Sequence, residues 1–158
     1  AVTNEGRYYE GLPITITKDV LPSEGPLSGI HAGLLLSESE YAFVLACDMP
    51  YYCRGYSQKL RELLLPESAG IITSLDGGKI EPFHGYYHKS LVHPIEEALA
   101  SGKRKIRIVA EENEMQMVPI SVAESFSPER SMFQNLNTES DLRDFLEARE
   151  SVRRSPCE

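Results

Sequence analysis

The sequence predicts one α/β domain with a mainly parallel sheet. Short apolar stretches typical of strands alternate along the chain with stretches of helical periodicity. The strongest strand candidate, Tyr41–Cys47, is continuously apolar rather than alternating, which indicates burial on both faces of a parallel sheet. The length of 158 residues suits a single domain with a substantial core and is short for two.

The elements follow from local patterns. Strands are expected at Pro13–Thr17, Tyr41–Cys47, Gly70–Leu75, Phe83–Tyr87 and Met117–Val122, with Ala1–Thr3 as the tail of a further strand. Helical spacing predicts helices within Leu27–Ser39, Tyr56–Leu65, Ser90–Ala100, Lys105–Glu112 and Ser140–Glu150. In the first helix, Gly29 and Gly33 lie four apart on one face, where a strand or ligand can approach closely. Residues 1–150 are thus expected to form the domain and residues 151–158 a frayed tail.

Composition narrows the class of protein. The net charge of -8 argues against nucleic-acid binding, which needs a basic patch, but permits an anionic small-molecule ligand. No apolar run reaches membrane-spanning length, and no secretory signal opens the sequence. The cysteines, Cys47, Cys53 and Cys157, are odd in number and lack metal-type spacing, which favours reduced thiols over a Cys47–Cys53 disulfide. We therefore expect a cytoplasmic protein without membrane or nucleic-acid partners.

Asp48 follows the apolar stretch Tyr41–Cys47, and a proline comes two residues later. In open α/β sheets, ligands bind outside the carboxyl ends of the strands. A carboxylate there suits Mg²⁺, which takes one or two protein carboxylates together with substrate phosphates. Alternatively, Asp48 caps the turn that follows the strand.

Five stretches in order resemble the molybdenum cofactor guanylyltransferases. GPLSGIHAGL (Gly25–Leu34) is similar to the GPLAGI-type loop and helix of that family, and YAFVLACDMPYY (Tyr41–Tyr52) to its strand ending in CDMP or CDTP. ITKDV, with Asp19, looks like the acidic strand end before the GPL loop. ASGKRKIR (Ala100–Arg107) resembles the AGERRV segment, and FQNLNTESDL (Phe133–Leu142) resembles the NxNTPEDL ending.

This resemblance implies a three-layer Rossmann-like nucleotidyltransferase fold. It implies an enzyme that transfers GMP from Mg·GTP to molybdopterin, forming molybdopterin guanine dinucleotide and releasing pyrophosphate. Asp48 would be the catalytic residue that holds Mg²⁺, the expected cofactor. Asn4 and Asp19, together with Asp48, would contact the nucleotide.

For the pterin, the resemblance implies Asn135, Asn137 and Arg104. Amides both donate and accept hydrogen bonds, which suits the edge of a heterocycle. Alternatively, Asn137 or Thr138 caps the last helix. Arg104 belongs to the densest basic run of the sequence, which either attracts the pterin phosphate or forms a solvated helix face.

Other residues receive no such role. Glu81 replaces a more usual His or Gln of the family, so no catalytic role is transferred to it. His84 and His88 are four apart, but Gly85 argues against the helix that would make them a metal pair.

One hallmark of the family is not matched. The family opens with a glycine-rich LAGG(x)SxRMGxDK loop that cradles the GTP phosphates, and the resemblance begins at the second strand. We therefore expect residues 1–150 to be a nucleotidyltransferase domain lacking its first strand and this loop.

The alternatives to the guanylyltransferase are a molybdopterin cytidylyltransferase, a sugar-phosphate nucleotidyltransferase and a non-catalytic binding module of the same fold. GTP and molybdopterin are the expected partners, with transient contact to other molybdenum cofactor biosynthesis proteins.

Overall fold

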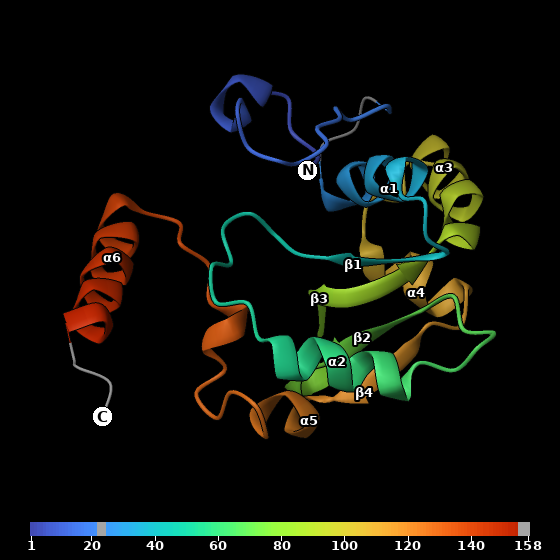
Figure 1. The fold of residues 1–158 in the computed structure, drawn as a ribbon. Coiled ribbons are helices and arrows are strands. Elements are labelled where there is room, and N and C mark those ends of the chain that lie inside the picture. Colours follow the sequence, from blue (N-terminus) through green and yellow to red (C-terminus); the bar gives the residue numbers. More distant parts are fainter. Residues whose placement is uncertain (22–24, 155–158) are drawn as a thin grey trace.

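A four-stranded sheet, in the order β1-β3-β2-β4, forms the centre of the molecule (Figure 1). The computed structural model describes residues 1–21 and 25–154, with side chains up to residue 149. The strands are β1 (Tyr41–Val44), β2 (Gly70–Ser74), β3 (Ile80–His88) and β4 (Gln116–Pro119). The α-helices are α1 (Pro26–Leu36), α2 (Arg54–Leu63), α3 (Val92–Ala100), α4 (Ile106–Glu112), α5 (Ile120–Glu124) and α6 (Glu139–Arg154). Short 3₁₀ turns are η1 (Gly6–Tyr9), η2 (Asp76–Gly78), η3 (Lys89–Leu91) and η4 (Ser131–Phe133).

Strand direction confirms the α/β class and shows where the sheet is mixed. β3 lies between β1 and β2 and pairs antiparallel with both, whereas β2 and β4 pair parallel. Strands β1, β2 and β4 therefore run in one direction, and their carboxyl ends lie at the same edge of the sheet. The N-terminal part of β3 begins at that edge.

Helices cover both faces of the sheet and give the predicted three layers (Figure 1). Alternation along β2 sends Ile71 and Ile72 to opposite faces, and both are fully buried. Ile72 packs into the core formed with α1, α3 and α4, while Ile71 packs into the core formed with α2 and α5. Among the described residues, no helix is both long enough and apolar enough to cross a membrane.

The strongest predicted strand differs from expectation in two ways. β1 ends at Val44 rather than Cys47, and its four residues are half-buried rather than buried on both faces. The reason is its position, because β1 has β3 on one side and forms the outer strand of the described sheet. Its other edge faces the N-terminal segment.

Two further strand predictions are corrected. The stretch Met117–Val122 forms a strand only up to Pro119, where α5 begins, because proline lacks the N–H that would continue the pairing. Near the N-terminus, Ala1–Thr3 and Pro13–Thr17 meet in a single parallel bridge between Val2 and Thr17. All five predicted helices are present with shifted ends, and Pro26 occupies the first turn of α1 as expected.

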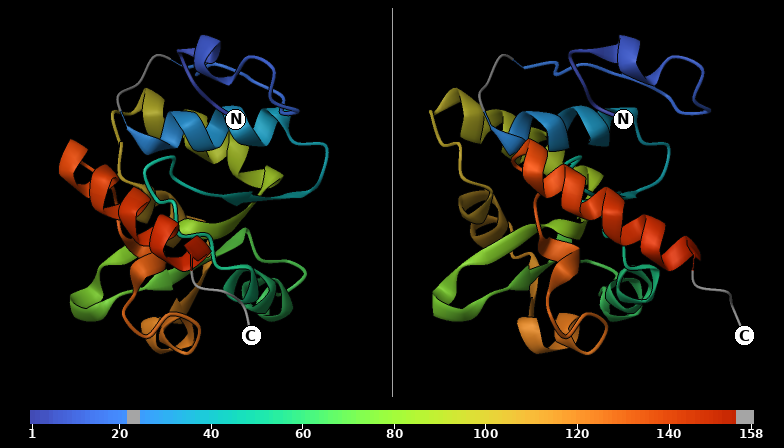
Figure 2. Two further views of the ribbon diagram at one scale, coloured as in Figure 1. Left: turned by 60° about the vertical axis from the view of Figure 1, so that its left-hand side comes forward. Right: turned by 90° about the vertical axis from the view of Figure 1, so that its left-hand side faces the viewer.

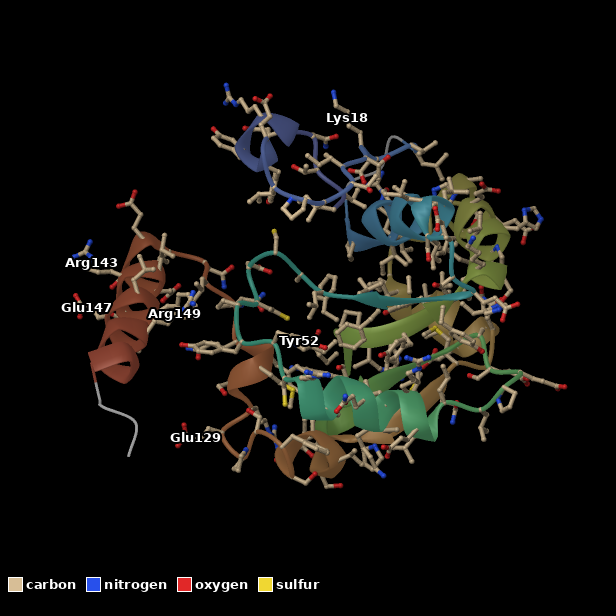
Figure 3. The ribbon with its side chains drawn as sticks, viewed as in Figure 1. Lys18, Tyr52, Glu129, Arg143, Glu147 and Arg149 are labelled. Atoms are coloured by element: carbon tan, nitrogen blue, oxygen red, sulfur yellow. The ribbon has the colours of Figure 1, made fainter. Side chains whose placement is uncertain are left out.

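Helix α6 lies across the end of the sheet toward which β1 runs, as Figures 1 and 2 show. It continues to Arg154, four residues beyond the predicted helix end, and the rest of the predicted tail, 155–158, lies outside the described residues. The rings of Phe145 on α6 and Tyr51 meet edge to face at 5.1 Å. Arg143 and Glu147 point away from the rest of the molecule in Figure 3.

A bulge in β3 brings its backbone unusually close to β2. Between the pairs Ile71–Tyr86 and Thr73–Glu81, β2 advances two residues while β3 advances five. A Cβ atom on Gly85 would lie 2.8 Å from the carbonyl oxygen of Ile71 and 2.9 Å from Cγ2 of Ile72. Glycine is therefore the residue that fits where the bulge rejoins the ladder.

Substituting Gly85→Ala should lower the free energy of unfolding by about 1–3 kcal/mol, because the added methyl group overlaps backbone atoms of β2. The matched control is Gly33→Ala in α1, where the new Cβ would make an ordinary contact at 3.8 Å from Val2. That variant should gain up to about 1 kcal/mol from helix propensity. Thermal or denaturant unfolding measures both changes, and equal stability of the two variants would contradict the close approach at Gly85.

Candidate active site

Asp48 lies in the turn that follows β1, at the carboxyl edge of the sheet. The turn is closed by a hydrogen bond from Met49 N to Ala46 O at 3.2 Å, and the Met49 side chain is buried beneath it. The Asp48 side chain is half-buried. Tyr52, labelled in Figure 3, lies on the same loop, and its hydroxyl hydrogen-bonds that of Ser57 at 2.7 Å. The loop is therefore fixed at both ends while Asp48 keeps access to solvent.

The structure brings the Asp48 turn beside the predicted asparagine pair. The backbone N–H of Leu136 donates to the Asp48 carbonyl oxygen at 2.8 Å, although the two residues are far apart in sequence. Asn135 and Asn137 flank Leu136, and both are exposed. The two segments that the family resemblance assigns to nucleotide and pterin therefore meet at one place on the sheet edge.

The helix-capping alternative is resolved in favour of Thr138. Its hydroxyl accepts a hydrogen bond from Asp141 N at 3.1 Å. The Asp141 carboxylate accepts from Asn137 N at 3.0 Å and from Thr138 N at 2.8 Å. Hydrogen bonding with the Thr138 side chain, followed by these two backbone bonds, holds the pKa of Asp141 below its ordinary value. The cap uses the backbone N–H of Asn137 and not its side-chain amide. The side-chain amide therefore remains available at the surface.

Glu81, to which the sequence analysis transferred no role, is a second carboxylate near Asp48. Its Oε1 accepts a hydrogen bond from Phe83 N at 2.9 Å. Burial raises the pKa of Glu81, the Phe83 bond partly offsets that rise, and the charge of Asp48 adds to it. The available signal was an acidic residue opening an apolar strand, EPFHGYY. The two carboxylates together make this edge of the sheet locally negative.

Asn4 and Asp19 lie on the N-terminal segment, and both are exposed. Oδ1 of Asp19 lies 4.0 Å from the position that a Cβ on Gly29 would take, which places Asp19 beside the first turns of α1. No contact within the described part of the chain joins Asn4 or Asp19 to Asp48. Their assignment to the nucleotide stays a prediction.

The basic run extends from the connection between α3 and α4 into the first turn of α4, and Lys103 and Arg107 pair with glutamates. Lys103 Nζ lies 2.5 Å from Glu112 Oε1, and Arg107 Nε lies 2.7 Å from Glu111 Oε1. Arg104 is exposed, and its role at the pterin stays a prediction. Pairing with glutamates weakens the positive field that the sequence suggested for this run.

A trough of about 860 Å³ lies between β1, α1 and the N-terminal segment; we call it the β1 trough. Gly29 and Gly33 line it, as do the residues from Ala42 to Cys47. Because Ala1 O and Thr3 N bond to Thr17, the N–H and C=O of Val2 point the other way, and none of the described backbone bonds uses them. The glycine face predicted to allow close approach thus lines an open channel that leads to Cys47, the neighbour of Asp48.

Cysteines and histidines form no further site within the described residues. Cys47 and Cys53 are free thiols, so the alternative disulfide is not formed, and Cys157 lies outside the described residues. His88 Nδ1 accepts a hydrogen bond from Ser90 N at 3.1 Å, whereas His84 is buried in the interior. Throughout the part of the chain that the structure describes, no group of three or more His, Cys, Asp or Glu side chains could hold a metal.

Known proteins match both the sequence and the fold. A probable molybdenum cofactor guanylyltransferase of Peptoclostridium acidaminophilum is 38% identical over 149 residues, covering 91% of this chain and 67% of that protein. A molybdenum cofactor guanylyltransferase of Syntrophotalea carbinolica is 35% identical over 141 residues, covering 89% of this chain and 67% of that protein. The chain thus spans about two thirds of the length of these curated relatives.

A solved structure of a protein with a related name has a similar fold. The crystal structure of molybdopterin-guanine dinucleotide biosynthesis protein A from Archaeoglobus fulgidus superposes with a TM-score of 0.76 at 26% identity, covering 95% of this chain and 77% of that one. The profile of the MobA-like NTP transferase domain matches residues 1–118, which include β1, β2, β3 and the Asp48 turn. The chain therefore belongs to the family of MobA-like NTP transferase domains and is an enzyme of the nucleotidyltransferase class.

Proposed function

We propose that this enzyme transfers GMP from Mg·GTP to molybdopterin, forming molybdopterin guanine dinucleotide and releasing pyrophosphate. The observation that carries this proposal is the Leu136 N to Asp48 O hydrogen bond of 2.8 Å. It joins the CDMP turn, assigned to the nucleotide, to the NLN segment, assigned to the pterin. Two substrates that must react can then meet at one carboxylate.

The reaction requires little covalent chemistry from the protein. The terminal phosphate of molybdopterin attacks the α-phosphorus of GTP, a new P–O bond forms, and the bond to the β-phosphate breaks as pyrophosphate leaves. The nucleophile belongs to the substrate, so no Ser–His or Cys–His pair is needed. The protein contributes alignment of the two phosphates and neutralisation of their charge.

The residues at the turn fit a magnesium ion. Asp48 supplies a hard, half-buried carboxylate, and the nearby Glu81 carboxylate increases the negative potential. Mg²⁺ typically takes one or two carboxylates plus substrate phosphates, and it would neutralise the triphosphate when bound. Asp48 would hold the ion directly, and the substrate phosphates would complete the coordination.

The remaining assignments follow the same division of the site. Asn4 and Asp19 would contact the nucleotide from the N-terminal side of the β1 trough. Asn135 and Asn137 would hydrogen-bond the pterin with their exposed side-chain amides, and Arg104 would attract its phosphate.

The free thiols Cys47 and Cys53 are consistent with a reducing compartment. We therefore propose that the reaction takes place in the cytoplasm, in transient contact with other molybdenum cofactor biosynthesis proteins.

We also propose that the β1 trough receives an extended strand, which completes the sheet and carries a glycine-rich phosphate loop. The outer edge of β1 borders the trough on one side, and the backbone of Val2, an isolated bridge residue, borders it on the other. The N–H and C=O groups of a strand edge readily pair with a further strand. The trough's lining of glycine, alanine and branched apolar residues suits the side chains of a buried strand. The chain aligns with 67% of the length of each of the two curated relatives, and the remainder is long enough for such a segment.

Substituting Asp48→Asn should abolish the Mg²⁺-dependent stabilisation by GTP without changing the melting temperature of the ligand-free protein. GTP at about 100 times its Kd should stabilise the wild type by about 2.7 kcal/mol, and the variant should lose most of that gain. Thermal-shift titration with GTP, CTP and ATP measures the effect and the base preference. The control is Asp144→Asn on α6, an exposed aspartate. If GTP with Mg²⁺ raises the melting temperature of Asp48→Asn as much as that of the wild type, Asp48 does not hold the metal.

Substituting Glu81→Gln should raise the melting temperature at pH 8 and leave it nearly unchanged at pH 4. The raised pKa of Glu81 means that its contribution to stability is fully present below its ordinary pKa of 4.5 and is lost as the pH rises through the higher folded-state pKa. Glutamine stays neutral and keeps an acceptor for Phe83 N. The control is the exposed Glu67→Gln. A lower melting temperature for Glu81→Gln at pH 8 would contradict this account.

The segment of the Peptoclostridium acidaminophilum relative that lies outside the match should bind the β1 trough when added as a polypeptide or fused to Ala1. Hydrogen exchange at the backbone amides of Tyr41–Val44 should slow because the free edge becomes paired. Gly33→Leu should block this protection by filling the trough, whereas Ala100→Leu, which places the same side chain on α3, should not. Unchanged exchange of β1 in the fusion would refute the added strand.

A further inference from the structure

Tyr56 and Thr73 form a hydroxyl pair in the interior of the protein. Both residues are fully buried, Tyr56 in the first turn of α2 and Thr73 near the end of β2. A hydrogen bond joins the Tyr56 hydroxyl to Oγ1 of Thr73. Burial raises the pKa of Tyr56, an effect that the Thr73 bond partly offsets, so the tyrosine keeps its hydroxyl proton. The bond therefore ties α2 directly to the central sheet.

On the helix side, the pair connects to the loop that carries Asp48. We call residues 45–53, which join β1 to α2, the Asp48 loop. The buried Ser57 of α2 donates its hydroxyl proton to the Arg54 carbonyl oxygen at 3.0 Å. Because Ser57 has only one hydroxyl proton, Tyr52 is the donor in the 2.7 Å hydrogen bond between these two hydroxyl groups. The last part of the Asp48 loop is thus anchored on the start of α2.

On the sheet side, the pair lies beside the second carboxylate. Thr73 and Glu81 are directly opposite each other in the antiparallel pairing of β2 and β3. Side chains at opposite positions lie on the same face of a sheet, with Cβ atoms about 4.5–5.5 Å apart. Glu81 therefore lies on the face of the sheet to which Thr73 holds α2.

The Tyr56 ring also touches the segment that leads to the asparagine pair. It meets the ring of Phe133 edge to face at 6.1 Å, and Phe133 comes two residues before Asn135. The ring of Phe126 also lies 6.1 Å from that of Tyr56, and a Cβ atom on Gly55 would lie only 3.0 Å from Phe126. Tyr56 is therefore closely packed at the junction of the three segments that form the candidate active site.

We propose that the Tyr56–Thr73 hydroxyl pair positions the candidate active site: it fixes the start of α2 on β2 and thereby sets where Asp48 stands relative to Glu81. Tyr56 and Thr73 are positioning residues, because they act through the Asp48 loop and β3 rather than on a substrate. The inference rests on the proposed function, in which Asp48 holds Mg²⁺ and Glu81 adds to the negative potential around it.

The physical argument is that stability alone does not require hydroxyl groups here. Replacing both partners of a buried hydrogen bond by apolar groups of the same shape is nearly neutral or stabilising, and phenylalanine with valine would be such a replacement. The hydroxyl groups add direction, because a hydrogen bond fixes the distance and angle between its partners. Apolar packing of similar stability defines a single arrangement less sharply.

The first measurement is hydrogen exchange in the ligand-free protein, at two amides that report on the site. Met49 N–H bonds to Ala46 O within the Asp48 loop, and Leu136 N–H bonds to the carbonyl oxygen of Asp48. In Tyr56→Phe, both amides should exchange about tenfold faster relative to the amides of β2, the equivalent of one lost hydrogen bond. Unchanged exchange at both amides would overturn the proposal.

The matched control is Tyr41→Phe, which removes the same hydroxyl group at the opposite end of β1. Tyr41 donates to the carbonyl oxygen of Ser68 at 2.7 Å, so this variant also loses a hydrogen bond. It should lower the melting temperature but leave exchange at Met49 and Leu136 unchanged. Thr73→Ser, which keeps the hydroxyl group, should keep the slow exchange.

The double variant Tyr56→Phe/Thr73→Val separates positioning from stability. It leaves neither hydroxyl unpaired, so its melting temperature should return close to that of the wild type. Exchange at the two amides should stay fast. In turnover of Mg·GTP with molybdopterin, kcat should stay about tenfold low with little change in KM, because a misplaced Asp48 affects the transition state. Recovery of wild-type exchange and kcat together with stability would overturn the proposal.

If the variants fail to fold, proton NMR of the wild type decides instead, because a buried hydroxyl proton in a hydrogen bond exchanges slowly with water. A hydroxyl signal in contact with both Tyr56 and Thr73 would support the pair, and its absence would overturn the proposal. An inactive wild type would refute the proposed function, whereas the exchange results would still decide whether the pair fixes the Asp48 loop.

Discussion

The close approach of β3 to β2 at Gly85 is the constraint on which the site depends. At the end of the β3 bulge, the backbone of Gly85 comes so close to β2 that no side chain would fit there. That bulge places Glu81 at the carboxyl edge of the sheet and buries His84 between the rings of Phe43 and Phe133. In a regular antiparallel strand these two side chains would lie at other positions.

The candidate active site is formed by segments that are distant in sequence. β1 delivers the Asp48 turn, β3 supplies a second carboxylate, and the Leu136 N–H holds the asparagine segment against the turn. The Thr138 cap and the Tyr51–Phe145 ring contact connect helix α6 to the same place. Phosphoryl-type transfer with a nucleophile supplied by the substrate depends on such positioning more than on any single reactive side chain.

Local patterns predicted the α/β class, the helices and the position of Asp48, because each rests on short-range periodicity and a strand end. Local patterns gave wrong predictions where the burial of a strand depends on which strands pair with it. The apolarity of Tyr41–Cys47 predicted burial on both faces, yet β1 is the outer strand of the described sheet beside an open trough. Glu81 and His84 received no role because their positions depend on the β3 bulge, a feature of the β2–β3 register that sequence spacing does not reveal. The cap at Thr138 was weighed correctly as an alternative, since its hydrogen bonds are local.

The most direct test of the proposed activity is to follow radiolabel from GTP in the presence of Mg²⁺ and molybdopterin. Label in the α-phosphate should appear in a molybdopterin guanine dinucleotide, and label in the γ-phosphate should leave as pyrophosphate. CTP should not replace GTP. Three results would contradict the account. The first is transfer from CTP alone, and the second is release of the γ-label as inorganic phosphate without a dinucleotide. The third is no transfer even when the relative's segment fills the β1 trough.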